Sequence, residues 1–412
     1  MSAPAPGRKA ALGFIFVTVV LTVLGFGLLI PVLPELVKEF RGGDVSAGSH
    51  SYGWLVSIYA LMQFFGAPIL GSLSDRFGRR RVILIALGGS TLDYVAMALA
   101  PNLTLLFVAR MAGGLTAGVM AAANAYVADV TPPENRAQGF GLIGAAFGLG
   151  FIIGPLLGGT LGSIDLRLPF WAAAGCSALN WIYGCFVLPE SLRPENRRAF
   201  SWRRANPVGA LLALRRFPAV LGLAQAYFIL TLGQMMLFSI WALYTSHRYG
   251  WDPQHVGFSL AAVGVLSAIV QAGLARRIIG ALGDTRAVAL GLLLSALSQL
   301  LYGLTTQGGF VYAIIVIGAF AGLAGPAIQS YITKHVPPTE QGAVQGVYSG
   351  LASLAGIPGP LISTWSFGWA VGPGQPEWLA GLPFFISSTL ALTALALAAR
   401  SFAKDHAPVR HA

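Results

Sequence analysis

The chain has 412 residues, of which 55% are hydrophobic and only 10% are charged, and its mean hydropathy is +0.70. Soluble globular proteins carry about 25% charged residues, so this composition excludes a soluble enzyme or a soluble binding protein and indicates an integral membrane protein. A formal net charge of +11 would by itself also suit a nucleic-acid partner.

Twelve apolar runs are long enough to cross a bilayer, which takes roughly 20 apolar residues in a helix. They predict an all-α membrane protein of twelve transmembrane helices, with little chain left for a soluble domain. The first run follows Arg8 and Lys9 but is longer than the apolar part of a signal peptide, so we interpret it as a retained helix. The runs cover residues 11–34, 52–73, 82–100, 103–127, 138–162, 169–189, 219–245, 256–280, 286–305, 309–332, 341–366 and 379–400.

The basic residues are concentrated on one side of these predicted spans. Of the 26 lysines and arginines, 21 fall on the side that carries both termini, four on the opposite side, and only Arg110 within a span. Loops rich in lysine and arginine stay in the cytoplasm, so we expect both termini to be cytoplasmic. Topology thus accounts for the positive charge, and no nucleic-acid partner is expected.

The loop between the second and third runs reads GSLSDRFGRRRV, residues 71–82. Gly71 would let two helices approach closely. Asp75 stands at a helix end beside several arginines, with which it can form charge-assisted pairs in one state of a transporter and lose them in another. Setting topology is the alternative role of the arginines, but it requires neither Asp75 nor Gly78. We predict a gating loop that consists of Gly71, Asp75, Arg76, Gly78, Arg79 and Arg80.

Two ionisable residues lie inside the third and fourth runs. Asp93 precedes the short connection at Pro101 by eight residues, and Arg110 follows Asn102 by eight residues. At about 1.5 Å per residue both lie roughly 12 Å below that turn. An intramembrane charge faces a partner or a watery cavity. A permanent, self-neutralising ion pair is one interpretation; the other is that Asp93 carries a proton whose binding changes with its burial and its distance from Arg110.

The fifth run contains GFIIGPLLGG, residues 150–159. Its glycines recur every fourth residue and give one smooth helix face for close packing, while a proline removes a backbone hydrogen bond and bends a helix. Ordinary packing between small residues is the alternative to a functional role. The residues of this helix motif are Gly150, Gly154, Pro155, Gly158 and Gly159.

The chain carries an internal duplication. Residues 126–156 align without a gap with residues 331–361, at an offset of 205, and share a PP turn and a GP pair. At this offset the fourth span aligns with the tenth, and the fifth span aligns with the eleventh. We therefore predict two pseudo-symmetric six-helix bundles, residues 1–189 and 219–412, joined by an arginine-rich cytoplasmic linker, residues 190–218. Parallel repeats of this kind are typical of alternating-access transporters.

Side chains suited to a substrate site are less specific. An amide within a span needs a partner inside the bundle, and aromatic walls are usual for small-molecule sites, although packing between helices is the alternative for each. No catalytic constellation, paired metal spacing or phosphate-binding loop is present, so no enzyme activity, metal or cofactor is expected. The substrate-binding candidates are Tyr59, Gln63, Asn124, Gln234, Trp241 and Gln271.

Residues 71–82, followed by LDYVAMAL, LFVARMAGGLTAG, YVADVTPPENRAQGFG and GFGLIGAAFGLGFIIGPLLGG, resemble the major facilitator superfamily and, within it, the tetracycline/proton antiporters. The resemblance is dense from about residue 12 to 190. It implies that Asp93 and Arg110 are functionally important, that the helix motif marks antiporters and helps to seal the interface between the halves, and that Gln63 and Gln271 occupy family positions.

The chain departs from that family at three positions. The family carries an Asp, a His and an Asp where this sequence has Thr22, Ser267 and Ser295. These departures put tetracycline itself, and the proton stoichiometry, in question.

We expect a monomeric, multi-pass protein of the bacterial inner membrane that exports a drug-like or amphiphilic small molecule in exchange for protons. The alternatives are a proton-coupled importer or facilitator of a metabolite such as an organic anion or a sugar, and, from another class, a membrane receptor or scaffold that transports nothing. An anion importer would need a cation in its cavity, for which Arg110 is the candidate.

Overall fold

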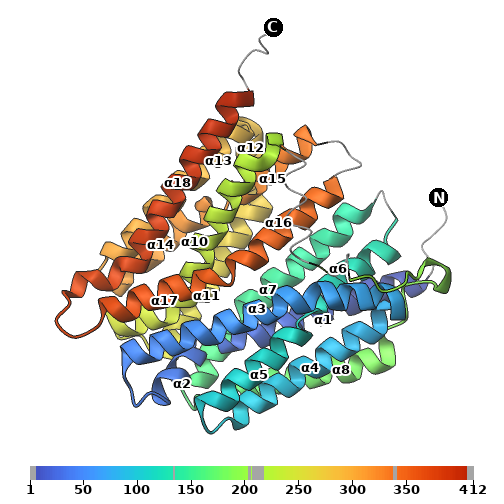
Figure 1. Ribbon diagram of the computed structural model, residues 1–412, viewed down its shortest axis with the longest axis horizontal. Helices are drawn as coiled ribbons and strands as arrows, with labels where there is room; N and C mark the ends of the chain where they lie inside the picture. The colour runs from blue at the N-terminus through green and yellow to red at the C-terminus, as the bar shows by residue number, and fades with distance from the viewer. Residues whose placement is uncertain (1–5, 133–134, 203–205, 207–217, 337–340, 406–412) are drawn as a thin grey trace. The chain divides into compact units, whose positions relative to one another are not determined.

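The computed structural model describes residues 6–132, 135–202, 206, 218–336 and 341–405, and within them the regular secondary structure is entirely helical (Figure 1). This result confirms the all-α fold. Long apolar runs have no alternative in a bilayer, because a helix satisfies every backbone hydrogen bond within its own segment.

Among the described residues, the first half of the chain contains the helices α1 to α8. A two-residue break separates α5 from α6, so that the predicted fourth span is formed by two helices. The bounds are α1 (Pro6–Leu29), α2 (Leu33–Glu39), α3 (Val45–Phe77), α4 (Arg79–Leu99), α5 (Leu103–Thr116), α6 (Val119–Val130), α7 (Arg136–Gly162) and α8 (Leu168–Val187). A 3₁₀ turn, η2 (Pro194–Asn196), follows α8.

The second half contains more interruptions. A π-helical segment, η4 (Ile269–Leu274), divides the predicted eighth span. The bounds are α10 (Pro218–Tyr249), α11 (Pro253–Ala268), α12 (Ala275–Leu282), α13 (Asp284–Leu304), α14 (Gly308–Ala321), α15 (Ala324–His335), α16 (Gln341–Ala355), α17 (Pro358–Ala370), η5 (Glu377–Gly381) and α18 (Leu382–Asp405).

Eleven helical stretches among the described residues are long and apolar enough to cross a membrane. The predicted eleventh span, residues 341–366, is not one of them; in the structure it comprises α16 and part of α17, which a turn at residues 356–357 separates. Pro358 is the first residue of α17, a position that proline favours because its missing N–H has no helical partner there.

The offset of 205 residues reappears in the helix boundaries. Adding 205 to the bounds of α4, α5 and α6 gives the bounds of α13, α14 and α15. Gly78 and Gly283, which precede α4 and α13, both have a positive φ, of 103° and 77°. The same helix breaks and the same turn conformation at one offset support the duplication, since chance similarity between apolar sequences would not reproduce them.

Contacts divide the chain into two units, each with its own apolar core. Unit 1 comprises Met1–Gly43, Ile58–Pro207 and Trp251–Gly264, and unit 2 comprises Asp44–Ser57, Val208–Gly250 and Val265–Ala412. Helices α3 and α11 therefore contribute to both. In unit 1, α1 packs on α7 and α8, and α4 packs on α5 and α8; in unit 2, α10 packs on α17 and α18, and α13 packs on α14 and α18. Of the predicted linker, residues 203–205 and 207–217 lie outside the described residues.

Candidate functional site

Asp93 of α4 and Arg110 of α5 form a buried ion pair in unit 1. Nη2 of Arg110 contacts Oδ2 of Asp93, and the exposed fractions of the two side chains are 6% and 4%. Oδ1 of Asp93 is also buried and accepts no hydrogen bond from the described residues. The matching depth expected from the sequence thus brings these two charges into contact.

The guanidinium of Arg110 also contacts α3. Its Cζ lies 4.6 Å from the centroid of the Tyr59 ring, within the range of a cation–π interaction. Gln63 follows Tyr59 by one helical turn, and residues four apart lie on the same helix face. Arg110 therefore connects the acidic residue to the α3 face that carries two of the predicted substrate-binding residues.

Glycines in α5 make these contacts possible. A Cβ atom at Gly113 would lie 2.5 Å from Cγ of Asp93, so only a glycine leaves room for the carboxylate. A Cβ atom at Gly114 would lie 2.5 Å from the carbonyl oxygen of Tyr59, so this glycine lets α5 approach α3. This pair was not predicted from the sequence, although a GG pair beginning three residues after Arg110 was a visible signal.

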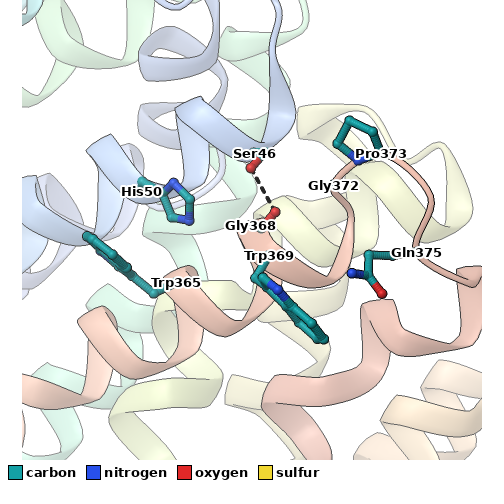
Figure 2. A pocket seen from close by; sticks show the side chains of 8 residues that line it. All are labelled: Ser46, His50, Trp365, Gly368, Trp369, Gly372, Pro373 and Gln375. Carbon is teal, nitrogen blue, oxygen red and sulfur yellow. Dashed lines mark hydrogen bonds between the residues drawn. The ribbon is translucent and has the colours of Figure 1, made fainter.

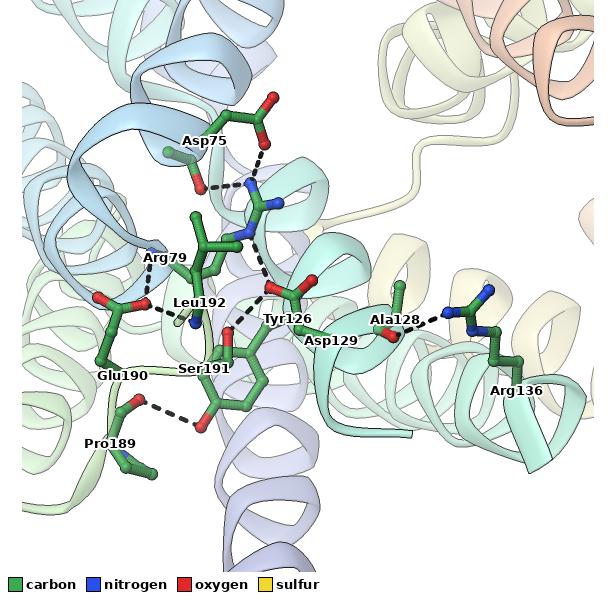
Figure 3. A network of polar contacts seen from close by, with 11 residues as sticks. Asp75, Arg79, Tyr126, Ala128, Asp129, Arg136, Pro189, Glu190, Ser191 and Leu192 are labelled. Atoms are coloured by element: carbon green, nitrogen blue, oxygen red, sulfur yellow. Dashed lines mark hydrogen bonds and ion pairs between the residues drawn. The ribbon is translucent and has the colours of Figure 1, made fainter. Parts of the chain in front are cut away.

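Arg79 is the centre of the predicted gating loop (Figure 3). Its Nη1 lies 2.6 Å from Oδ1 of Asp75 and 3.0 Å from Oγ of Ser74, and its Nε lies 3.0 Å from Oδ2 of Asp129. Asp75 and Asp129 thus bind one guanidinium from two helices, α3 and α6. The charge-assisted pair predicted for Asp75 is present, and Asp129 is an additional partner.

The turn into α4 is held by Glu190, which follows α8. Oε1 of Glu190 accepts hydrogen bonds from the backbone N–H groups of Arg79, at 2.8 Å, and Leu192, at 3.1 Å. Gly78 has φ 103°, a conformation that side chains disfavour, and a Cβ there would collide with the Glu190 carboxylate. Glu190 and Asp129 were missed from sequence because pairing over such separations depends on tertiary structure.

The other predicted loop residues have separate contacts. Arg80 donates from Nη2 to the carbonyl oxygen of Cys185 at 2.6 Å, and exposed Arg76 lies with Cζ 5.0 Å from the ring centroid of Phe77. A Cβ at Gly71 would meet no described atom within 4 Å, so the close helix approach expected there is not found.

The glycine face of α7 packs on α1. Added Cβ atoms at Gly150, Gly154 and Gly158 would each collide with the α1 backbone; at Gly154 the atom would lie 2.8 Å from Cα of Gly27. Gly159 instead faces the beginning of α11, where Gln254 Cα would lie 3.1 Å from its Cβ. The helix continues through Pro155 without a break.

The six substrate-binding candidates are divided between the two units: Tyr59, Gln63 and Asn124 belong to unit 1, and Gln234, Trp241 and Gln271 belong to unit 2. Gln63 is half-buried, whereas Asn124, Gln234 and Gln271 are exposed. Trp241 is 3% exposed and packs edge-to-face on Tyr302 in unit 2, with ring centroids 5.0 Å apart. Gln271 lies in the π-helical segment. Among the described residues, Tyr59 and Gln63 are the candidates on a common face beside the buried ion pair.

A pocket of about 440 Å³ lies in unit 2, between the beginning of α3 and the end of α17 (Figure 2). Its wall includes His50 and Trp365, whose ring centroids are 4.8 Å apart, and a 2.7 Å hydrogen bond from Ser46 Oγ to the Gly368 carbonyl oxygen. No predicted substrate-binding residue lines it.

Comparison with known proteins agrees with this architecture. The family model of the Major Facilitator Superfamily matches residues 15–360. The chain is 40% identical over 372 residues to "Tetracycline resistance protein, class C" of Escherichia coli, covering 88% of this chain and 93% of that one, and 29% identical over 345 residues to "Multidrug resistance protein 2" of Bacillus subtilis (strain 168), covering 82% and 84%. The crystal structure of the human organic anion transporter MFSD10 (TETRAN) has a TM-score of 0.71 at 27% identity, over 96% of this chain and 100% of that one. The chain therefore belongs to the Major Facilitator Superfamily and, within it, to the family of the tetracycline resistance proteins.

Proposed function

We propose that the chain is a secondary transporter that exports a drug-like or amphiphilic small molecule, of the tetracycline or multidrug type, by alternating access and in exchange for protons. Its 40% identity to a tetracycline resistance protein supports the drug class. The proposal includes twelve spans, two six-helix bundles at residues 1–189 and 219–412 joined by the linker 190–218, cytoplasmic termini, the inner membrane and a monomer.

The buried Asp93–Arg110 pair beside Tyr59 is the observation that carries this proposal. A proton on Asp93 would remove the carboxylate charge and end its attraction for Arg110, which also lies against the Tyr59 ring. We propose that the guanidinium then shifts along α3, toward the face that carries Gln63. Proton binding and the shape of the substrate site would in this way be coupled through one side chain.

Thr22, Ser267 and Ser295 carry hydroxyl groups where the tetracycline antiporters carry ionisable residues. This difference supports a drug-like substrate class that is wider than tetracycline. The Thr22 hydroxyl donates to the Thr18 carbonyl oxygen at 2.7 Å, within its own helix. A hydroxyl of this kind does not ionise at physiological pH. With Thr22 and Ser295 in place of carboxylates, Asp93 is the group that we propose to carry the proton.

The gating loop would control the accessible state. Arg79 holds Asp75 of α3 and Asp129 of α6 together, and α3 also carries Tyr59. Movement of α3 at the substrate site would therefore strain this ion-pair network at the end of the same helix, and we propose that the network opens and closes with the transport cycle.

A metabolite anion is the second candidate substrate. The resemblance to a human organic anion transporter favours it. The charge of Arg110, the cation that an anion site would use, is however already balanced by Asp93. An anion would have to compete with that carboxylate, so the structure favours a neutral or zwitterionic drug.

Inverted membrane vesicles test the proposal. With an acidic interior imposed by respiration, we expect vesicles that contain the protein to accumulate tetracycline or another drug from a panel, and to lose it when an uncoupler collapses the gradient. Uptake of an organic anion with no drug accumulation would support the second candidate instead. Equal accumulation of every compound in vesicles without the protein would reject both.

A further inference from the structure

The segment after α8, residues 189–202, is fixed to unit 1; we call it the linker strap. The carbonyl oxygen of Pro189 accepts a hydrogen bond from the Tyr126 hydroxyl at 3.2 Å, and Ser191 Oγ lies 3.1 Å from Oδ2 of Asp129. Further along, the backbone N–H of Arg198 donates to the Asp75 carbonyl oxygen at 3.0 Å. The linker strap therefore has a defined place beside the ends of α3 and α6.

The linker strap exposes unneutralised positive charge. Arg193, Arg197 and Arg198 are exposed, and their guanidinium groups form no ion pair with any residue that the structure describes. The linker strap itself has three arginines and two glutamates, and one of the glutamates, Glu190, is bound by the backbone N–H groups of Arg79 and Leu192. The positive-inside rule explains the sign of these charges, but it does not require that the segment be bonded to helix ends.

Aromatic side chains accompany the charges. Trp202 is 72% exposed and contacts Phe200 edge-to-face, with ring centroids 5.0 Å apart. Phe77, two residues after Asp75, is 41% exposed and lies under the guanidinium of Arg76. Tryptophan is enriched at the headgroup level of membranes because its ring is apolar and its N–H polar.

We propose that the linker strap binds the headgroup of an anionic phospholipid of the cytoplasmic leaflet. Guanidinium groups bind phosphate oxygens through paired hydrogen bonds, and clusters of arginine beside a transmembrane helix attract acidic lipids. A zwitterionic headgroup balances its own phosphate and gains less from three arginines. Trp202 would enter the interface beside the bound headgroup. This inference does not depend on which substrate is transported.

Quenching of Trp202 fluorescence by brominated lipids tests the proposal on the purified full-length protein in vesicles. The contribution of Trp202 is the difference between the wild type and Trp202→Phe. We expect brominated phosphatidylglycerol to quench this contribution about twofold more than brominated phosphatidylcholine, and high salt to reduce the difference through screening. Free inorganic phosphate should not abolish it.

The matched control removes three charges elsewhere. The triple variant Arg193→Gln, Arg197→Gln, Arg198→Gln should lose the preference for phosphatidylglycerol, whereas Arg276→Gln, Arg277→Gln, Arg286→Gln, which changes three exposed arginines of α12 and α13, should keep it. Equal quenching by the two lipids in the wild type would overturn the proposal. The proposal would also be overturned if the linker strap variant kept the preference for phosphatidylglycerol, or if the control variant lost it to the same extent.

Discussion

Asp93 is a carboxylate whose position depends on one neighbouring glycine and one arginine. Its side chain is 4% exposed, and Arg110 supplies the charge that makes this burial tolerable. Tyr59 shares the guanidinium. A small displacement of either Arg110 or Gly113 would therefore change the electrostatic environment in which a proton would bind.

Gly113→Ala should therefore impair the site without changing any charge. The added methyl would lie 2.5 Å from Asp93 Cγ and push the carboxylate away from Arg110. Overpacking in a core typically costs 1–3 kcal/mol, so we expect a lower melting temperature and loss of drug accumulation in vesicles. Gly144→Ala is the control, because its Cβ meets no described atom within 4 Å. Unchanged accumulation by Gly113→Ala would show that the position of the carboxylate does not matter.

At the scale of single elements, the duplicated helices carry ion pairs of opposite polarity. Arg79 at the start of α4 pairs with Asp129 of α6. At an offset of 205, Asp284 at the start of α13 pairs with Lys334 of α15, with Nζ 2.5 Å from Oδ2. The first pair belongs to a network that includes Asp75 and Ser74, whereas the second is more exposed, with Lys334 64% exposed.

Charge reversal should therefore be tolerated in one half of the chain only. The double variant Asp284→Lys, Lys334→Asp should recover most of the drug resistance lost by either single variant, because the pair reforms with its charges exchanged. The double variant Arg79→Asp, Asp129→Arg should stay inactive, because an aspartate at 79 faces Asp75. Minimum inhibitory concentrations measure both. Recovery of drug resistance by the double variant Arg79→Asp, Asp129→Arg would contradict the ion-pair network described for Arg79.

The glycine face of α7 gives a second prediction at this scale. Gly154→Ala places a methyl group 2.8 Å from Gly27 Cα and 2.9 Å from the Leu24 carbonyl oxygen, so α1 must move away. We expect a melting temperature several degrees below wild type, in line with overpacking costs of 1–3 kcal/mol. Gly148→Ala in the same helix has open space and should be at least as stable as wild type. Equal melting temperatures would exclude the close packing.

Sequence periodicity and length located the helices because a bilayer permits little else, and the short connection after α4 placed Asp93 beside Arg110 by counting residues. The break between α5 and α6 was not predicted, because the residues around it are as apolar as their neighbours. Asp129 and Glu190 were missed for another reason. They contact Arg79 from 50 and 111 positions away, and only the packing of α6 and α8 on α4 brings them there.

At the scale of the whole molecule, one long helix connects the proposed sites. Helix α3 (Val45–Phe77) carries Tyr59 beside the buried pair and Asp75 in the gating loop. Pro68 lies between these two residues and removes one backbone hydrogen bond, but the helix continues through it, so we propose that α3 carries displacement from one site to the other. Coupling in the proposed cycle therefore needs no pathway beyond Asp93, Arg110 and α3.

Drug-dependent proton movement tests the central claim, that Asp93 carries the coupled proton. In proteoliposomes with an imposed pH gradient and a pH-sensitive dye inside, adding drug should cause proton flux with the wild type and with Glu39→Gln, an exposed carboxylate variant. Asp93→Asn should show no drug-dependent flux while still binding drug. Proton flux at the wild-type rate from Asp93→Asn would contradict the account.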